Sequence, residues 1–161
     1  MDDRARIALV TGASSGIGAA TVRALAAAGL GTVAAARRLE RCEELAREVA
    51  GRALRLDVSD PESVAALAGA VPEVDLIVHS AGGALGLDRV AEAPEERWLE
   101  MYESNVLGIV RVTRALPALR SGRDPQIVIL GSSGWRDVPV PGPKASSASG
   151  LVAFAVHEGG E

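Results

Sequence analysis

Short apolar runs alternate with longer amphipathic stretches along the first 130 residues of the chain. The short runs have the length of β-strands, whereas the longer stretches repeat apolar residues at the three- and four-residue spacing of helices. The strands are apolar on both sides, as a sheet covered by helices on both faces requires. The expected strands are 6–10, 32–36, 53–56, 75–79 and 126–130, and the expected helices are 16–28, 39–50, one that begins after 59–62, and 94–116.

This alternation of strands and helices predicts an α/β fold, a doubly wound parallel sheet of the Rossmann type with strand order 3-2-1-4-5. The ligand crevice of such a sheet lies beside the first and fourth strands, where the strand order reverses. Residues 1–133 are expected to form this dinucleotide-binding domain, and residues 134–161 a partly irregular tail of the same domain. The apolar run 151–156 is too short to assign as helix or strand.

The segment 11–18 reads Thr-Gly-Ala-Ser-Ser-Gly-Ile-Gly and lies between the first expected strand and the first expected helix. A helix N-terminus at this place presents unpaired backbone N–H groups and a partial positive charge to the phosphates of a dinucleotide. Gly12 permits the tight turn, Gly16 the approach of the backbone to the ligand, and Gly18 the close packing of helix on strand. A Gly-rich structural turn is the alternative, which the strand–turn–helix context disfavours. The expected cofactor residues of this segment are Gly12, Ser14, Ser15, Gly16, Ile17 and Gly18.

Two arginines, Arg37 and Arg38, follow the second expected strand, where a dinucleotide fold faces the adenosine ribose. An acidic residue there accepts a hydrogen bond from the ribose 2′-hydroxyl of NAD, whereas a basic residue pairs with the 2′-phosphate of NADP. No acidic residue accompanies these arginines, so the sequence favours NADP(H). The alternative is that both begin the solvated face of the following helix, since Arg41 comes next on it.

The TGxxxGxG spacing, the segment 98–108 and the Gly-Ser of 131–132 resemble the short-chain dehydrogenase/reductase family. The similar branch contains the NADP-dependent serine and 3-hydroxy acid dehydrogenases. The resemblance covers about residues 5–133. It implies an oxidoreductase that transfers a hydride between a nicotinamide and a small alcohol or carbonyl substrate.

The resemblance also implies roles for residues that follow the third and fourth strands. An Asp at the position of Asp57 accepts a hydrogen bond from the adenine amino group. The segment 79–82 reads His-Ser-Ala-Gly where the family has Asn-Asn-Ala-Gly beside the nicotinamide ribose, and a Ser replaces only part of the hydrogen bonding of an Asn. His79 ends a buried strand with no partner visible in the sequence, so a structural histidine is expected rather than a base. The cofactor residues expected in these segments are Asp57, Val58, Ser80, Ala81 and Gly82.

Two catalytic residues are implied by the same resemblance. Asn105, in the last expected helix, aligns with an Asn that positions a water in the proton relay; the alternative is a polar residue at a helix kink. Ser132, at the end of the last expected strand, aligns with the Ser that hydrogen-bonds the substrate carbonyl. Ser133 is the second choice, and a role confined to capping the strand is the alternative. Tyr102, one turn before Asn105, is expected to be a packing residue.

The general acid/base of the family is a Tyr, and a Lys four residues later lowers its pKa, because an unperturbed phenol titrates near ~10. The only Tyr and the only Lys of this chain are Tyr102 and Lys144. Counting from the expected catalytic Ser places Ala145 and Ser149 at the two positions, and a second register places Lys144 and Ala148 there. The sequence therefore lacks the Tyr-x-x-x-Lys pair, and the alternative function is a catalytically silent dinucleotide-binding fragment or pseudoenzyme.

Family members continue beyond the region of resemblance, which ends at about residue 133, with a helix, two strands and a substrate loop. The resemblance thus implies that the C-terminal part is truncated or divergent, and that the fifth strand is left as an exposed sheet edge. A frameshift or truncation of a complete reductase gene is the hypothesis that explains both departures.

Composition narrows the functional classes. The chain has 161 residues, 48% hydrophobic and 24% charged, as a single globular domain requires, and its net charge of −4 gives no electrostatic reason to expect nucleic acid. No run reaches the length of a membrane helix and the N-terminus does not resemble a signal peptide, so no membrane association and a cytoplasmic location are expected. The single Cys42 excludes an intramolecular disulfide and a Cys-rich metal site. The expected partners are a small-molecule substrate and a second copy of the chain.

Overall fold

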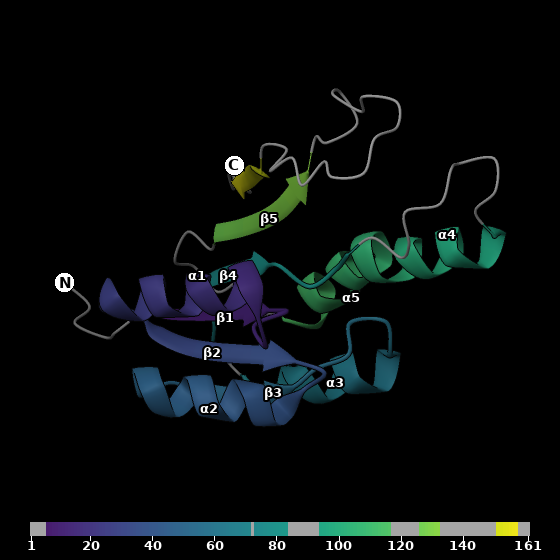
Figure 1. The fold of residues 1–161 in the computed structure, drawn as a ribbon. Coiled ribbons are helices and arrows are strands. Elements are labelled where there is room, and N and C mark those ends of the chain that lie inside the picture. The colour runs from purple at the N-terminus through teal and green to yellow at the C-terminus, as the bar shows by residue number, and fades with distance from the viewer. Residues whose placement is uncertain (1–5, 72, 84–93, 117–125, 133–150, 158–161) are drawn as a thin grey trace, which may run out of the picture.

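A computed structural model describes residues 6–71, 73–83, 94–116, 126–132 and 151–157, with only the backbone described for Ser132 and for 151–157. Six strands form one sheet in the order β3-β2-β1-β4-β5-β6, and helices lie on both of its faces (Figure 1). The strands are β1 (Ile7–Thr11), β2 (Gly31–Ala36), β3 (Arg52–Arg55), β4 (Leu76–His79), β5 (Gln126–Ser132) and β6 (Leu151–His157). The helical elements are α1 (Gly16–Ala27), α2 (Leu39–Val49), α3 (Pro61–Ala70), α4 (Glu95–Tyr102), the π-helix η1 (Glu103–Leu107) and α5 (Gly108–Ala115).

The first five strands are parallel, and their order confirms the predicted 3-2-1-4-5 arrangement. β1 occupies the centre, where Leu9 pairs with Val33 of β2 on one side and with Ile77 of β4 on the other. The chain reverses its direction of travel across the sheet between β1 and β4. The carboxyl ends of these two strands therefore bound the crevice in which a doubly wound fold holds its ligand.

Successive residues of β1 point to opposite faces of the sheet and divide the core into two layers. Leu9 packs with Ile77, Val112 and other residues of the layer under α3 and α5. Ala8 and Val10 pack instead in the layer under α1 and α2, which also contains Cys42. Burial of each large side chain stabilises the fold by about 1.5–3 kcal/mol, so both layers hold the strand ends in fixed positions.

The run 151–157 forms β6, which pairs antiparallel with β5 from Gln126 opposite His157 to Ser132 opposite Leu151. The expectation that the fifth strand is an exposed edge is therefore wrong, because β5 is paired on both sides. Unpaired backbone N–H and C=O groups along an edge strand are satisfied by any extended segment that can reach them. A short apolar run fits a strand or a buried helix equally well, so its periodicity alone did not assign it.

The expected helix 94–116 forms as α4, η1 and α5 in unbroken succession, with a π-helical segment in its middle. The π-turn coincides with polar side chains that bind back onto the helix. The hydroxyl of Ser104 donates to the carbonyl oxygens of Glu100 and Met101, at 3.1 and 3.2 Å. Such insertions occur frequently at functional sites.

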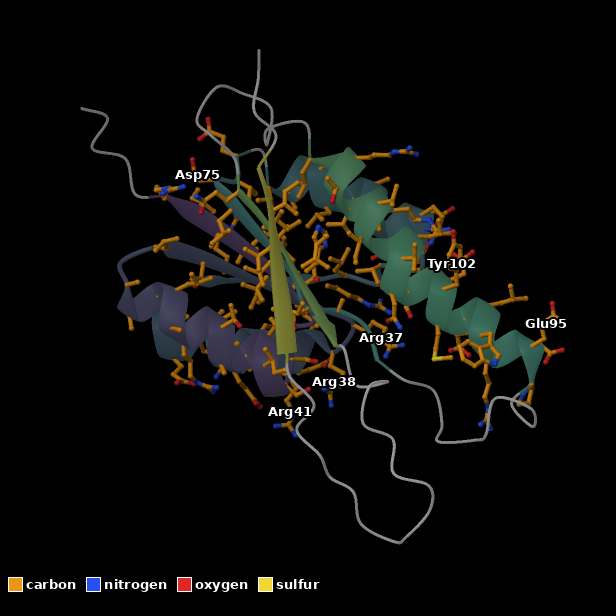
Figure 2. The ribbon with its side chains drawn as sticks, turned by 90° about the horizontal axis from the view of Figure 1, so that it is seen from above. Arg37, Arg38, Arg41, Asp75, Glu95 and Tyr102 are labelled. Carbon is orange, nitrogen blue, oxygen red and sulfur yellow. The ribbon has the colours of Figure 1, made fainter. Side chains whose placement is uncertain are left out.

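Large apolar side chains lie exposed on the outer side of this helix. Tyr102, which is expected to be a packing residue, is 52% exposed (Figure 2). It belongs to a stripe with the four-residue spacing of one helix face, which is called the α4–α5 stripe below. The stripe consists of Trp98, Leu99, Tyr102, Val106 and Val110.

Candidate functional site

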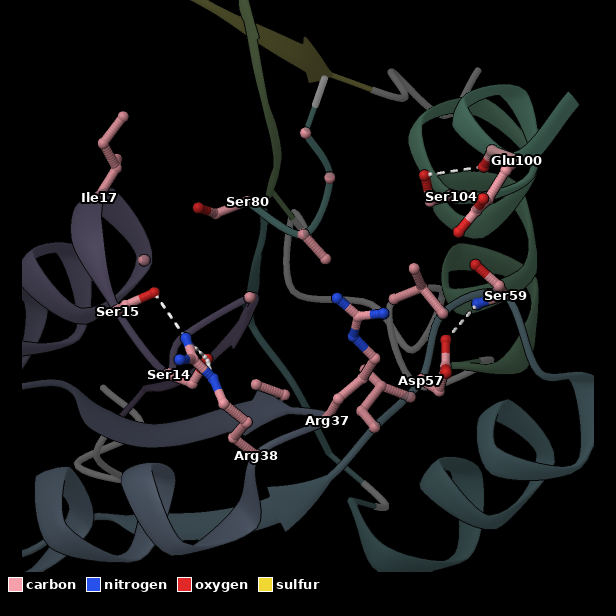
Figure 3. Close-up of a pocket in the computed structure, with 18 residues that line it drawn as sticks. Ser14, Ser15, Ile17, Arg37, Arg38, Asp57, Ser59, Ser80, Glu100 and Ser104 are labelled. Atoms are coloured by element: carbon pink, nitrogen blue, oxygen red, sulfur yellow. Dashed lines mark hydrogen bonds between the residues drawn. The ribbon is translucent and has the colours of Figure 1, made fainter. Parts of the chain in front are cut away.

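A cavity of about 560 Å³ opens at the carboxyl ends of the first four strands (Figure 3). This volume lies in the range of small-molecule and cofactor sites. All the expected cofactor residues except Gly16 line it, from four separate segments of the chain. These residues are Gly12, Ser14, Ser15, Ile17, Gly18, Arg37, Arg38, Asp57, Val58, Ser80, Ala81 and Gly82.

The Gly-rich turn is packed against the loop that follows β4. Gly12 has φ +67°, and a Cβ placed on it would lie 2.7 Å from the backbone nitrogen of Ala81 and from the carbonyl oxygen of Ser80. The hydroxyl of Thr11 accepts hydrogen bonds from both of these residues' N–H groups, each at 3.1 Å. A Cβ on Gly18 would lie 2.5 Å from the Gly12 carbonyl oxygen. The turn thus requires glycine at both positions, and Thr11 joins the two loops that meet at the reversal of strand order.

The N-terminus of α1 faces the cavity with its backbone donors uncapped by a side chain. Ser15 is the N-cap residue, yet its side chain makes no capping hydrogen bond. The first N–H groups of a helix have no partner within the helix, and the helix dipole adds partial positive charge there. Gly16, with φ +54° and open space where a Cβ would be, leaves the backbone accessible. This arrangement suits a phosphate group.

The two arginines after β2 differ in their contacts. Arg38 donates to the hydroxyl of Ser14 at 2.9 and 3.2 Å and to that of Ser15 at 2.9 Å, so it is tied to the Gly-rich loop. Arg37 extends into the cavity, and within the described ranges its guanidinium makes no hydrogen bond or ion pair (Figure 3). Figure 2 shows both beside Arg41 at one end of the sheet. Both arginines line the cavity, and Arg38 is also the N-cap residue of α2, so a role of either in cofactor binding stays a prediction.

Oxygen acceptors gather at the other end of the cavity, where Asp57 and Ser59 follow β3 (Figure 3). The carboxylate of Asp57 accepts the N–H of Ser59 at 3.0 Å, and the Asp57 N–H donates to the hydroxyl of Ser63 at 2.9 Å. Glu100 and Ser104 face this end from α4 and η1. The cavity is therefore cationic near the Gly-rich loop and anionic near β3 and α4.

Asn105 lies on η1 beside the cavity and is bonded to the loop after β4. Its side chain accepts the N–H of Gly83 at 2.9 Å and donates to the Gly83 carbonyl oxygen, also at 2.9 Å. Gly82 has φ +149°, and a Cβ there would lie 2.5 Å from the Asn105 Oδ1 atom. The side chain thus holds the loop against a π-turn, and its expected role in a proton relay stays a prediction.

His79 is a structural residue, as expected from the sequence. It is 2% exposed, and its Nε2 atom lies 3.0 Å from the hydroxyl of Thr113 on α5. Burial lowers the pKa of the imidazole from 6.5 to about 4, so the ring is neutral near pH 7. It does not line the cavity.

The remaining catalytic candidates lie at the end of β5 or beyond it. Ser132 ends β5, two strands from β1, but its side chain lies outside the described atoms. The second-choice Ser and the positions compared with the Tyr-x-x-x-Lys pair also lie outside the described residues. These are Ser133, Lys144, Ala145, Ala148 and Ser149.

Sequence reasoning missed six residues of the cavity wall. Among them, Glu100 and Ser104 stand four positions apart, the spacing of one helix face, which is the signal that could have found them. Ser59 lies two residues beyond Asp57 in the same loop. The missed residues are Ala36, Leu56, Ser59, Gly83, Glu100 and Ser104.

Metal-binding clusters and membrane-spanning helices are absent from the residues that the structure describes. No group of three or more His, Cys, Asp or Glu side chains there has an arrangement that could hold a metal ion. No helix among the described residues has the length and apolarity needed to cross a membrane.

The short chain dehydrogenase family model matches residues 6–155. The chain therefore belongs to the short-chain dehydrogenase family. It is 52% identical over 130 residues to an uncharacterised oxidoreductase of Mycobacterium tuberculosis, covering 80% of this chain and 52% of the relative. It is 36% identical over 159 residues to an NADP-dependent 3-hydroxy acid dehydrogenase of Schizosaccharomyces pombe, covering 91% of this chain and 61% of the relative.

Solved structures match the same region. A variant of actinorhodin polyketide ketoreductase with NADPH superposes with a TM-score of 0.77 at 31% identity, covering 84% of this chain and 56% of that chain. A serine dehydrogenase complexed with NADP+ superposes with a TM-score of 0.66 at 33% identity, covering 70% and 48%. The chain thus spans about half the length of the proteins that it matches.

Proposed function

We propose that the cavity binds NADP(H) and that the chain supplies the cofactor site of an oxidoreductase. The reaction class is hydride transfer between the nicotinamide and a small alcohol or carbonyl compound. The observation that carries the proposal is the guanidinium of Arg37, which has no hydrogen-bond or ion-pair partner among the residues that the structure describes and extends into a cavity built around a Gly-rich turn. The NADP-dependent 3-hydroxy acid dehydrogenase among the relatives supports both the cofactor and a small hydroxy acid as substrate.

The residues present fit the parts of this cofactor. The uncapped N-terminus of α1, with Gly16 and Ile17, suits the pyrophosphate. Arg37 suits the 2′-phosphate, because a guanidinium forms paired hydrogen bonds with phosphate oxygens. Arg38 donates to the hydroxyls of Ser14 and Ser15, and it is proposed to hold the Gly-rich loop beside the phosphates.

The bound cofactor would supply the hydride, and the protein would orient the substrate and manage the proton. Ser132 is proposed to donate a hydrogen bond to the substrate carbonyl from the end of β5. Asn105 is proposed to position a water while its side chain holds Gly83. The second candidate is a silent NADP(H)-binding protein, which is kept because the given sequence contains no Tyr-x-x-x-Lys pair. NADPH oxidation with a panel of short 3-oxo acids separates the two: turnover supports the enzyme, and binding without turnover supports the silent protein.

The α4–α5 stripe is proposed to pack against a second copy of the chain. In an antiparallel pair the Glu95 and Glu96 end of one helix would face the Arg111 and Arg114 end of its partner. Light scattering of the wild-type chain and of Tyr102→Glu tests this: a dimer that the variant splits supports it, and a wild-type monomer refutes it.

The proposed location is the cytoplasm, where a thiol such as that of Cys42 stays reduced.

The cofactor assignment is tested most simply with the adenosine half alone. We expect 2′,5′-ADP to bind at least about tenfold more tightly than 5′-AMP, because the two differ only in the 2′-phosphate that Arg37 is proposed to bind. The comparison by calorimetry involves none of the residues beyond β5. Equal affinities for the two nucleotides would contradict the NADP(H) assignment.

A further inference from the structure

The anionic end of the cavity contains a carboxylate that the proposed NADP(H) site does not yet use. Glu100 lies on α4, across the cavity from the Arg38 side of the Gly-rich loop and above the segment of Asp57 and Ser59 (Figure 3). The two carboxylates reach this end from different elements, that of Asp57 from the loop after β3 and that of Glu100 from α4. They thus form two walls of one recess.

The carboxylate of Glu100 accepts no hydrogen bond from the residues of α4 or η1 that border this recess. Ser104 is the other cavity residue on that helix face, and its hydroxyl donates to the carbonyl oxygens of Glu100 and Met101. One carboxylate oxygen of Asp57 accepts a hydrogen bond from the Ser59 N–H. The Glu100 carboxylate makes no hydrogen bond or ion pair with any residue that the structure describes, and it is exposed to the cavity mouth.

We propose that Glu100 is a specificity-determining residue that accepts a hydrogen bond from the exocyclic amino group of the adenine base. The inference rests on the proposed NADP(H) function and deepens it. An exocyclic amino group has two N–H donors on opposite sides, so it can serve an acceptor on each wall: Asp57 from β3 and Glu100 from α4. An ionised carboxylate only accepts hydrogen bonds, and it therefore selects an amino group over a carbonyl oxygen at the same ring position.

This assignment makes a prediction about a matched pair of nucleotides. NADPH and its hypoxanthine analogue differ at that ring position, where an oxygen acceptor replaces the amino group, and at the adjacent ring nitrogen N1, which carries a proton in hypoxanthine. The wild-type chain should bind NADPH about tenfold more tightly, since a hydrogen bond to a charged group contributes this order of discrimination. Glu100→Gln should weaken NADPH and strengthen the analogue, because an amide can donate to the oxygen that a carboxylate repels.

The experiment measures the dissociation constants of both nucleotides by quenching of tryptophan fluorescence at about physiological ionic strength. The matched control is Glu96→Gln, which removes the same charge from the first turn of α4, where the side chain does not line the cavity. Glu100→Gln should reduce the NADPH-to-analogue preference by about fivefold or more, whereas Glu96→Gln should leave it within twofold. Circular dichroism checks that both variants fold.

Each outcome bears on a different statement. A preference that Glu100→Gln leaves unchanged, with NADPH still bound, overturns the role of Glu100 alone. Equal strengthening of both nucleotides by Glu100→Gln overturns it too, because the carboxylate then acts only as a repulsive charge toward the phosphates. Failure of the wild-type chain to bind either nucleotide overturns the proposed function itself, and the adenine assignment with it.

Discussion

Replacement of Arg37 by Ala removes the cavity cation that makes no hydrogen bond or ion pair within the described ranges. Because the side chain is exposed and unpaired, its loss should not destabilise the fold. A hydrogen bond between charged groups contributes about 1.5–3 kcal/mol, and exposure to water favours the lower end of that range. The substitution should therefore weaken NADPH binding about 10- to 30-fold. NADH, which lacks the 2′-phosphate, should lose less than about twofold.

The assay is calorimetric titration of wild type, Arg37→Ala and the control Arg41→Ala with both nucleotides. Arg41 stands on α2 with an exposed ion pair to Glu44 at 3.8 Å and does not line the cavity, so its loss controls for a general change in charge. The difference between the nucleotides should shrink as salt is added, because exposed charges are screened. Equal weakening of NADPH and NADH by Arg37→Ala would refute the assignment of Arg37 to the 2′-phosphate.

Three further predictions concern the loops and the core. Gly12→Ala should lower the free energy of unfolding in urea by about 2–4 kcal/mol, because its Cβ would meet backbone atoms at 2.7 Å and the residue has a positive φ. The control Gly16→Ala also has a positive φ but lies in open space, so it should cost about 1 kcal/mol. Equal costs for the two substitutions would contradict the described packing. Asn105→Ala removes two hydrogen bonds to Gly83 and should speed hydrogen exchange of the Gly83 amide by about tenfold or more, and unchanged exchange would show that the contact holds nothing in place. The folded-state pKa of His79 lies near 4, below its ordinary value of 6.5, so its contribution to stability is complete above pH 6.5 and is lost as the pH falls toward 4. This loss amounts to roughly 3 kcal/mol, and His79→Gln should flatten that part of the stability–pH curve; parallel curves for the two proteins would contradict it.

Local rules were sufficient to predict the five parallel strands and most of the cavity wall. The turn at Gly12 and the close approach at Gly18 follow from a Gly-rich segment between a strand and a helix, and the structure shows both geometries. The position of Arg37 could be predicted because a residue that directly follows a strand of a parallel sheet lies at the carboxyl edge of that sheet. These predictions involve only neighbours in sequence and a known order of strands.

The contacts that were missed join segments far apart in the chain. The bonds of Asn105 to Gly83 span 22 residues and depend on a π-turn that leaves no periodic signal in the sequence. The antiparallel pairing of β6 joins two strands that are separated along the chain, so the apolar run of 151–156 alone was ambiguous. Glu100 and Glu96 are both acidic residues of α4, and only the position of this helix beside the cavity distinguishes them.

The central claim is that the carboxyl edge of this sheet is a working NADP(H) site, and titration of the wild-type chain with NADPH and NADH in parallel tests it most directly. The account predicts saturable binding of NADPH with one site per chain, at least about tenfold tighter than that of NADH. Absence of binding, or an equal or tighter affinity for NADH, would contradict it.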